Sequence, residues 1–417
     1  MLYLYLANYA KEAMHLLRRC MERKRMNVYM DNAATTKLSR AAKEAMLPVF
    51  DEIYGNPSSL HHWGQQASAA LQNARERIAA CLHADPKEIY FTSGGSEADN
   101  QAIYSCAMAG ARQGKRHIVS TQIEHHAVLH YLHSLEEQGF ALTLLPVEPE
   151  TGLIRPEEVE AALTDGTCLV TVMMANNEIG TIQPIAEIGA LCKKRKIPFH
   201  TDAVQAVGHV PVDVQALGAG LLSLAGHKFH GPKGVGALYC RRGVPLLPLL
   251  IGGAQERNRR AGTENLPAIV GMAAALEEAV AEMSETSARI AAYRDQLIEG
   301  LIGLPHTYLN GDRVRRLPGS VNFCFDGLES ESLLLLLDAR GIGASSGSAC
   351  TSGSLDPSHV LLAIGRSHAV ANGSLRLSLS RYTTQAEIDH ALREIPKVVE
   401  YLRGMSPYWD EIIKGEQ

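Results

Sequence analysis

Long hydrophobic runs, a basic surplus and paired cysteines are all missing from this sequence of 417 residues. The apolar run at residues 333–337 is far shorter than the roughly 20 residues that a membrane span requires. The formal net charge of −5 leaves no clustered basic surface for DNA or RNA. Eight cysteines are scattered without CxxC spacing, which argues against a disulfide scaffold or a structural zinc site and fits a reducing compartment. We therefore expect a cytoplasmic protein that has no membrane or direct nucleic-acid partner.

Features of a secretory signal are also missing from the first 26 residues, which have neither a positive n-region nor a small-residue cleavage site. Residues 11–25 have the pattern of a basic amphipathic helix, which is typical of weak membrane or partner contacts. The other interpretation is a disordered arm, or residues upstream of a true start at Met26. We treat 1–26 as an N-terminal extension outside the fold.

Short apolar, β-branched runs alternate with helix-length stretches from residue 28 onward. Seven strands are predicted, at residues 88–92, 117–121, 141–145, 168–174, 198–201, 221–225 and 236–240. Helices are predicted between several of them, at residues 97–111, 127–138 and 185–195. This alternation predicts an α/β fold with a mainly parallel sheet that helices cover on both faces. Ligands bind to such sheets at the C-terminal ends of the strands.

Two domains are expected from the chain length. The large domain is predicted over residues 38–283, and a small α+β domain over 27–37 together with 284–417. One long helix, at residues 267–301, is predicted to connect them. Shorter elements follow in the small domain, at residues 320–325, 331–340, 374–379 and 385–402.

A lysine directly follows one of the predicted strands, in the segment Leu221-Leu-Ser-Leu-Ala-Gly-His-Lys228. A buried lysine costs free energy unless it is paired or used chemically. A desolvated amine with a lowered pKa is nucleophilic and forms a Schiff base with an aldehyde cofactor. A solvated lysine in a surface turn is the alternative, and Lys233 competes for the same role.

An aspartate ends a neighbouring predicted strand, Pro198-Phe-His-Thr-Asp202, and Gln205 follows three residues later. A carboxylate at the ring nitrogen of pyridoxal keeps the ring protonated and able to accept electrons. Asp202 suits that role, and Gln205 can donate to the phenolic oxygen. Capping of a helix is the alternative for Asp202. Lys228 and Asp202 together predict a site for pyridoxal 5'-phosphate.

Three other strand ends carry polar residues. Phe91-Thr-Ser-Gly-Gly-Ser-Glu97 joins a strand to a helix, where backbone N–H groups, the helix dipole and the Ser96 hydroxyl favour a phosphate. This signal is weak by itself. His125 is placed to stack on a cofactor ring and to move protons, for which a near-neutral pKa is suited. Asn177 is a candidate donor to a cofactor oxygen.

Helical spacing also gives His126, His130 and His133 a common face, which is one way to bind a metal ion. No acidic residue is placed to complete the ligand set, so we predict no metal site.

One cysteine has surroundings unlike those of the others. Cys350 lies within Ser345-Ser-Gly-Ser-Ala-Cys350-Thr-Ser-Gly-Ser354, a composition that predicts an exposed and mobile loop. Such a thiol suits a sulfur carrier, because its thiolate has to reach a substrate and then an acceptor. An incidental loop cysteine is the alternative. Arg376, in a predicted strand, has the guanidinium fork to bind a substrate carboxylate, with a structural ion pair as its alternative.

These segments together resemble the NifS/IscS-type cysteine desulfurases of the class V aminotransferase family. The likeness runs from about residue 28 to 409 and has several motifs in the family's order. They are Tyr29-Met-Asp-Asn-Ala-Ala-Thr-Thr36, Gly55-Asn-Pro-Ser58, Thr92-Ser-Gly-Gly-Ser-Glu97, Asn176-Asn-Glu-Ile-Gly180, Gly226-His-Lys228, Arg260-Ala-Gly-Thr-Glu-Asn265 and Ser345-Ser-Gly-Ser-Ala-Cys-Thr-Ser352. The last motif resembles the family's first group, which has a long loop, here at about 345–375.

The resemblance implies a fold-type I homodimer with pyridoxal phosphate near the subunit interface. It implies covalent cofactor binding by Lys228, a ring-nitrogen contact for Asp202, and stacking with proton transfer for His125. The other implied contacts are to the phosphate from Gly95, Ser96, His227 and, across the interface, Thr263; to cofactor oxygens from Asn177 and Gln205; and to the substrate from Arg376 and Asn177. Ala225 departs from the pattern, since many relatives have a phosphate-contacting serine there.

The activity implied is the conversion of L-cysteine to L-alanine, with the sulfur passing to Cys350 as a persulfide. A sulfur-acceptor protein, such as an iron–sulfur scaffold or a tRNA-thiolation protein, would then receive it. A selenocysteine lyase and a class V aminotransferase are the alternative enzymes. The aminotransferase would have no need for Cys350.

Overall fold

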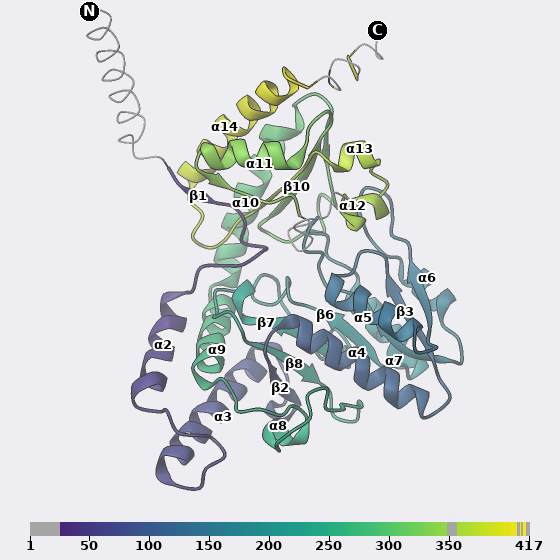
Figure 1. Cartoon of the computed structure of the whole chain (residues 1–417), viewed down its shortest axis with the longest axis vertical. Coiled ribbons are helices and arrows are strands. Elements are labelled where there is room, and N and C mark those ends of the chain that lie inside the picture. Colours follow the sequence, from purple (N-terminus) through teal and green to yellow (C-terminus); the bar gives the residue numbers. More distant parts are fainter. Residues whose placement is uncertain (1–25, 348–356, 407–408, 410–411, 414–417) are drawn as a thin grey trace, which may run out of the picture.

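The computed structural model describes residues 26–347, 357–406, 409 and 412–413 of the chain. Figure 1 shows two regions, a larger one below and a smaller one above, joined by α9 and α10. Within these described residues, no helix is long and apolar enough to cross a membrane.

A seven-stranded sheet forms the centre of the larger region, in the order β2-β8-β7-β6-β5-β3-β4. Its strands are β2 (Ile89–Thr92), β3 (His117–Thr121), β4 (Ala141–Leu145), β5 (Thr167–Thr171), β6 (Phe199–Asp202), β7 (Leu221–Ala225) and β8 (Gly236–Cys240). Strand β8 is antiparallel to both of its neighbours, and every other pair is parallel. The predicted α/β class and mainly parallel sheet are confirmed. Strand β5 ends three residues before the predicted position, although Val172 and Met174 still donate to carbonyls of β6.

Helices pack on both faces of this sheet because successive strand residues point to opposite sides. Ile118 and Leu169 lie in a core with helices α4 (Gly95–Ala111) and α5 (His126–Glu136). Their neighbours Val119 and Val170 lie in the core of the other face. That core also contains residues of α2 (Arg40–Asp51), α3 (His62–Leu82), α6 (Pro156–Ala162), α7 (Ile185–Arg195) and α9 (Leu266–Ala281). Short connecting turns are η1 (Pro86–Glu88), η2 (Gly226–Lys228) and α8 (Gln255–Asn258).

The smaller region has an antiparallel sheet and a core of its own. The sheet runs β12 (Ser374–Ser378), β10 (Ser320–Phe325), β9 (Thr307–Leu309), and a parallel pair joins β1 (Val28–Tyr29) to β11 (Ile342–Gly343). Its helices are α10 (Met283–Ile302), α11 (Ser330–Ala339), α12 (His359–Ala363), α13 (His368–Ala371) and α14 (Gln385–Arg403). Val28 and Met30 belong to this core, which supports our proposal that residues 27–37 are part of the small domain.

The prediction of a single connecting helix at 267–301 is wrong, because the structure has two helices that meet at Glu282. Helix α9 is buried on most sides and packs against α2 and α3, whereas α10 packs against α14 and β10. The chain therefore leaves one core for the other at this residue. Arg381 pairs there with both Glu282 and Glu278, and its guanidinium lies 3.0 Å from Glu278 Oε2.

A buried ion pair joins α3 to the first strand of the sheet. Arg75 and Glu256 are 6% and 4% exposed, and they form two hydrogen bonds, of 2.9 and 2.6 Å. Glu256 also accepts from the Phe91 backbone N–H, and Arg75 donates to the Ile89 carbonyl. Each charge is therefore fully paired inside the protein.

Removal of one partner from this pair should be costly, because the other charge would remain buried without compensation. We expect Glu256→Gln to lower the free energy of unfolding by about 3–5 kcal/mol, measured by urea denaturation. The control is Glu44→Gln, which breaks the exposed Arg40–Glu44 pair and should leave the free energy of unfolding nearly unchanged. Equal effects in the two variants would contradict this assignment.

Candidate active site

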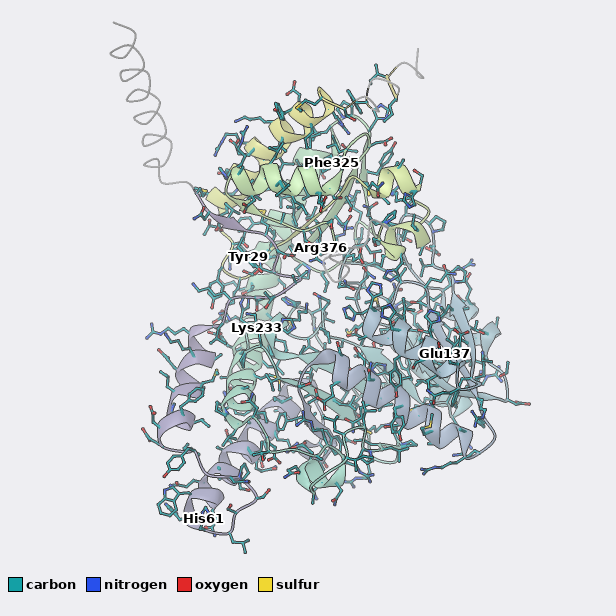
Figure 2. The ribbon with its side chains drawn as sticks, in the orientation of Figure 1. Tyr29, His61, Glu137, Lys233, Phe325 and Arg376 are labelled. Atoms are coloured by element: carbon teal, nitrogen blue, oxygen red, sulfur yellow. The ribbon has the colours of Figure 1, made fainter. Side chains whose placement is uncertain are left out.

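The residues singled out in the sequence gather at the C-terminal ends of the parallel strands. Lys228 ends the turn η2, directly after β7, and Asp202 is the last residue of β6. The Lys228 ammonium donates to the backbone carbonyls of Ala33 and Ala34, at 2.6 and 2.9 Å. Lys233, the competing lysine, is exposed. Figure 2 shows Lys233 in the part of the large region that lies nearest to the small one.

Asp202 is a buried carboxylate whose charge is only partly compensated. Its Oδ1 accepts from the Val204 N–H at 2.9 Å. Burial raises the pKa of Asp202 to about 6, although the Val204 hydrogen bond and the Lys228 charge act in the opposite direction. A cationic ring nitrogen is a partner that would keep this carboxylate ionised.

The N-terminus of α4 forms an open cradle beside both of these residues. Gly94 precedes the helix and supplies no side-chain cap, so the first N–H groups of the helix remain available to an anion. A Cβ atom on Gly95 would lie 2.7 Å from Val204 and 3.7 Å from Ala225. The cradle therefore adjoins the chain that follows Asp202 and the chain that precedes Lys228. Ser96 is exposed at the same helix end.

His125 is the N-cap of α5, and its Nδ1 accepts from the Ala127 N–H at 3.1 Å. Burial, followed by the Lys228 charge, lowers the pKa of His125 to about 4. This pKa is lower than the near-neutral value that suits a proton-transfer group. The ring is neutral, and because Nδ1 is occupied as an acceptor its hydrogen lies on Nε2.

Arg376 lies where the two regions meet, as Figure 2 shows, and is 2% exposed. It donates to Asp31 Oδ1 at 2.9 Å and to the Asn177 carbonyl at 3.0 Å. The structural ion pair considered for Arg376 therefore exists. Among the described residues, its Nε has no hydrogen-bond partner, so the guanidinium keeps a buried donor that a carboxylate would satisfy.

The remaining residues that were predicted to contact the cofactor are Gln205, His227 and Thr263. Gln205 donates to the Ala33 carbonyl at 3.0 Å, and Nδ1 of His227 lies 3.2 Å from Thr35 Oγ1. Burial, and then the Lys228 charge, lowers the pKa of His227 to about 4. Thr263 is exposed, in the chain segment between α8 and α9. The nearby Arg260 pairs with Glu97 of α4 at 2.8 Å, which ties that segment to the cradle.

Two sequence hypotheses concern residues elsewhere. Cys350 lies outside the described residues, so its assigned role stays a prediction. Of the three histidines that were considered as metal ligands and set aside, His133 bonds to Glu136 at 2.8 Å. In the described ranges, no three His, Cys, Asp or Glu side chains are arranged to hold a metal ion.

Several polar residues of this site, all but Asp31 buried, were not identified from the sequence. Asp31, Asp99, Glu124 and His200 were each missed. His200 stands two residues before Asp202 on β6, so strand periodicity alone would place it on the same face. Glu124 accepts hydrogen bonds from the Thr121 hydroxyl at 2.7 Å and from the Met173 N–H at 3.0 Å.

Comparisons with known proteins agree with this arrangement. Residues 28–391 match the family described as aminotransferase class-V. A cysteine desulfurase IscS from Methanosarcina thermophila is 55% identical over 380 residues, which cover 91% of this chain and 94% of that protein. A cysteine desulfurase IscS from Clostridium botulinum is 52% identical over 393 residues, which cover 94% of this chain and 98% of that protein.

Solved structures show the same likeness. A NifS-like protein matches with a TM-score of 0.85 at 38% identity and covers 90% of this chain and 100% of its own. SspA in complex with cysteine matches with a TM-score of 0.75 at 38% identity and covers 86% of this chain. The chain thus belongs to the class V aminotransferase family, whose members have the fold-type I architecture.

The buried Glu124 gives a test of the electrostatics of this site. Burial raises the pKa of Glu124 to about 8, well above its value in an unfolded chain. Its contribution to stability is therefore fully present below about pH 4.5 and is lost as the pH rises through 8. Between pH 5 and 9 the wild type should lose roughly 3–5 kcal/mol of unfolding free energy relative to Glu124→Gln.

Urea denaturation at several pH values measures this difference. The exposed Glu137→Gln provides the control and should run parallel to the wild type. A difference between wild type and Glu124→Gln that did not change with pH would contradict a protonated Glu124.

Proposed function

We propose that this protein is a pyridoxal-phosphate-dependent cysteine desulfurase that converts L-cysteine to L-alanine and takes the sulfur on Cys350. The convergence of Lys228, Asp202 and the open α4 N-terminus carries this proposal. A lysine amine, a buried carboxylate and an anion cradle are what an aldehyde, a ring nitrogen and a phosphate require. The desulfurase relatives, about half identical over nearly the whole chain, support the reaction.

The described residues fit this cofactor. The cradle at Gly95 and Ser96 would hold the phosphate, Asp202 the ring nitrogen, and Lys228 the aldehyde carbon. Gln205 donates to the Ala33 carbonyl, and the Asn177 carbonyl accepts from Arg376. The side chains of Gln205 and Asn177 would contact the cofactor oxygens. When bound, pyridoxal phosphate supplies the electron sink that the reaction needs.

The substrate would be held by Arg376. The ion pair with Asp31 and the bond to the Asn177 carbonyl fix the guanidinium plane, and Nε is left for a carboxylate. The neutral His125 ring would pack against the bound cofactor and donate from Nε2. Proton transfer would then involve the Lys228 amine and Nε2 of His125, since Nδ1 of His125 is occupied as a helix cap.

The sulfur step needs a nucleophile that the described residues do not supply. The six cysteines in the described ranges are unpaired, and five of them are buried. Burial raises the pKa of Cys192 and Cys240 to about 12 and that of Cys324 to about 11, so these thiols are poor nucleophiles. This supports Cys350 as the sulfur acceptor within the chain and a reducing cytoplasm as its location. A scaffold or tRNA-thiolation protein would receive the sulfur next.

A homodimer is also part of the proposal. Large apolar side chains are exposed on α2, around the start of α3 and before α8, namely Leu47, Phe50, Tyr54, Leu60, Trp63, Leu250 and Ile251. Exposed apolar groups of this number are typical of a protein interface. Thr263 follows the last of them in the chain, which supports its contact with the cofactor of a partner subunit.

Lys228→Ala tests the cofactor half of this proposal. The variant should lose the visible absorbance of covalently bound pyridoxal phosphate, whereas Lys233→Ala should keep it. Absorbance spectra and borohydride trapping of the purified proteins measure this. Trapping at Lys233 instead would overturn the assignment of Lys228.

Cys350→Ala tests the sulfur half. Alanine release from L-cysteine should fall by about 10²-fold or more, because a nucleophile is lost, while the cofactor absorbance stays. The control is Cys81→Ala, at a partly exposed position on α3, which should release alanine at the native rate. Release at the native rate from Cys350→Ala, or alanine formation that depends on a keto acid, would favour an aminotransferase.

A further inference from the structure

Both ends of one chain segment meet at a buried carboxyl group beside the candidate site. The structure describes the chain up to Gly347 and again from Pro357, on either side of the segment that contains Cys350. After this segment, Ser358 Oγ donates to Glu178 Oε2 at 2.5 Å. Before it, a Cβ atom on Gly347 would lie 2.9 Å from the same oxygen, so the backbone passes directly against the carboxyl. One side chain therefore contacts the chain on both sides of Cys350.

Glu178 is itself firmly held. It is 3% exposed, its N–H donates to Asn176 Oδ1 at 2.8 Å, and its carbonyl accepts from the Asn322 side chain of β10 at 3.1 Å. It directly follows Asn177, whose carbonyl accepts from Arg376 at 3.0 Å. The carboxyl that contacts both ends of the segment thus has a fixed position relative to Arg376, the proposed ligand of the substrate carboxylate.

The end that follows Cys350 is anchored by two further contacts. Ser358 Oγ accepts from two backbone N–H groups at the start of α12 and caps that helix. His359 Nε2 donates to the Glu124 carbonyl at 3.0 Å. Figure 1 shows α12 at the edge of the smaller region that faces α5. Because Glu124 directly precedes His125, this end is tied to the cofactor side of the candidate site.

The end that precedes Cys350 is tied to the substrate side. Ser345 and Arg376 exchange two backbone hydrogen bonds, of 3.2 and 2.6 Å, and Ser345 Oγ accepts from the Gly347 N–H at 3.2 Å. Gly347 has a φ of +96°, a conformation that favours glycine. A residue three positions along the chain from a fixed point stays within about 11 Å of it, and Cys350 is three positions from Gly347. Fixing Gly347 near Arg376 therefore limits where the Cys350 thiol can go.

We propose that Glu178 is a positioning residue for the sulfur step, because its carboxyl holds both ends of the Cys350 segment beside the bound substrate. This proposal rests on the proposed function. In the sulfur step, the Cys350 thiolate bonds to the substrate sulfur, and the Cβ–S bond of the substrate cysteine breaks. The electron pair of that bond stays on the carbon, which takes up a proton, and alanine leaves. Closed ends reduce the volume that the thiol samples, so its effective concentration at the substrate rises.

Hydrogen exchange measures this anchoring without any reaction. Glu178→Ala removes the acceptor of Ser358, so the backbone N–H groups of Gly347, Val360 and Leu361 should exchange at least about threefold faster than in the wild type. Glu178→Gln keeps an oxygen that accepts from Ser358, and its exchange should match that of the wild type. Unchanged exchange in Glu178→Ala would overturn the proposal.

Transfer of labelled sulfur from L-cysteine to Cys350 measures the consequence in the holoenzyme. At saturating substrate Glu178→Ala should lower the rate by about tenfold, whereas the KM for L-cysteine should stay within about threefold, since Arg376 still binds the carboxylate. Glu178→Gln should keep the rate within about threefold of the wild type. A native rate in Glu178→Ala, or an effect confined to KM, would contradict the positioning role.

Ser358→Ala removes the same bond from the other side, and it provides the test if Glu178→Ala fails to fold. Its rate should fall as in Glu178→Ala, and the double variant should be no slower than the slower single variant. The matched control is Ser367→Ala, which removes the N-cap of the neighbouring α13 instead and should transfer sulfur at the native rate. Equal slowing in Ser367→Ala would mean a general effect of helix caps and would overturn the proposal.

Failure of the proposed function would give a different result. If the wild type transferred no sulfur to Cys350, the proposed function would fail, and hydrogen exchange would still show whether Glu178 holds the segment. If exchange rose in Glu178→Ala while sulfur transfer stayed native, the proposed function would stand and the positioning role of Glu178 would fall.

Discussion

The ammonium group of Lys228 is held by two backbone carbonyls, those of Ala33 and Ala34, and the site depends on this interaction. A lysine at the end of a buried strand costs free energy unless acceptors meet it. Those acceptors come from a segment whose beginning belongs to the core of the small region. Lys228 and the small-region core are therefore coupled through the short segment from Val28 to Ala34.

The same segment contacts three other residues of the candidate site. Asp31 fixes Arg376, the Ala33 carbonyl accepts from Gln205, and Thr36 donates to the His227 carbonyl. The last two contacts join this segment to residues at the ends of strands of the large sheet, far away in the sequence. Packing of the two regions against each other thus assembles the candidate site, because Arg376 lies in one region and Lys228 in the other.

Charge at the site is kept low. Three buried carboxyl groups, Asp99, Glu124 and Asp202, all have raised pKa values because burial disfavours their charged forms. The buried histidines have lowered values for the same reason. A cation beside Asp202, such as the ring nitrogen of the proposed cofactor, would favour the ionised form of this carboxylate.

The sequence by itself determined the sheet and the main functional residues. The seven strands are visible because short apolar, β-branched runs are local signals, and Lys228, Asp202 and Gly95 stand at or near strand or helix ends. Tertiary structure alone decided the break at Glu282, the pairing of Arg376 with Asp31 and the neutral state of His125. These depend on burial and on partners up to 345 residues away, and no local pattern encodes the dielectric surroundings or the charge of a side chain that arrives from another region.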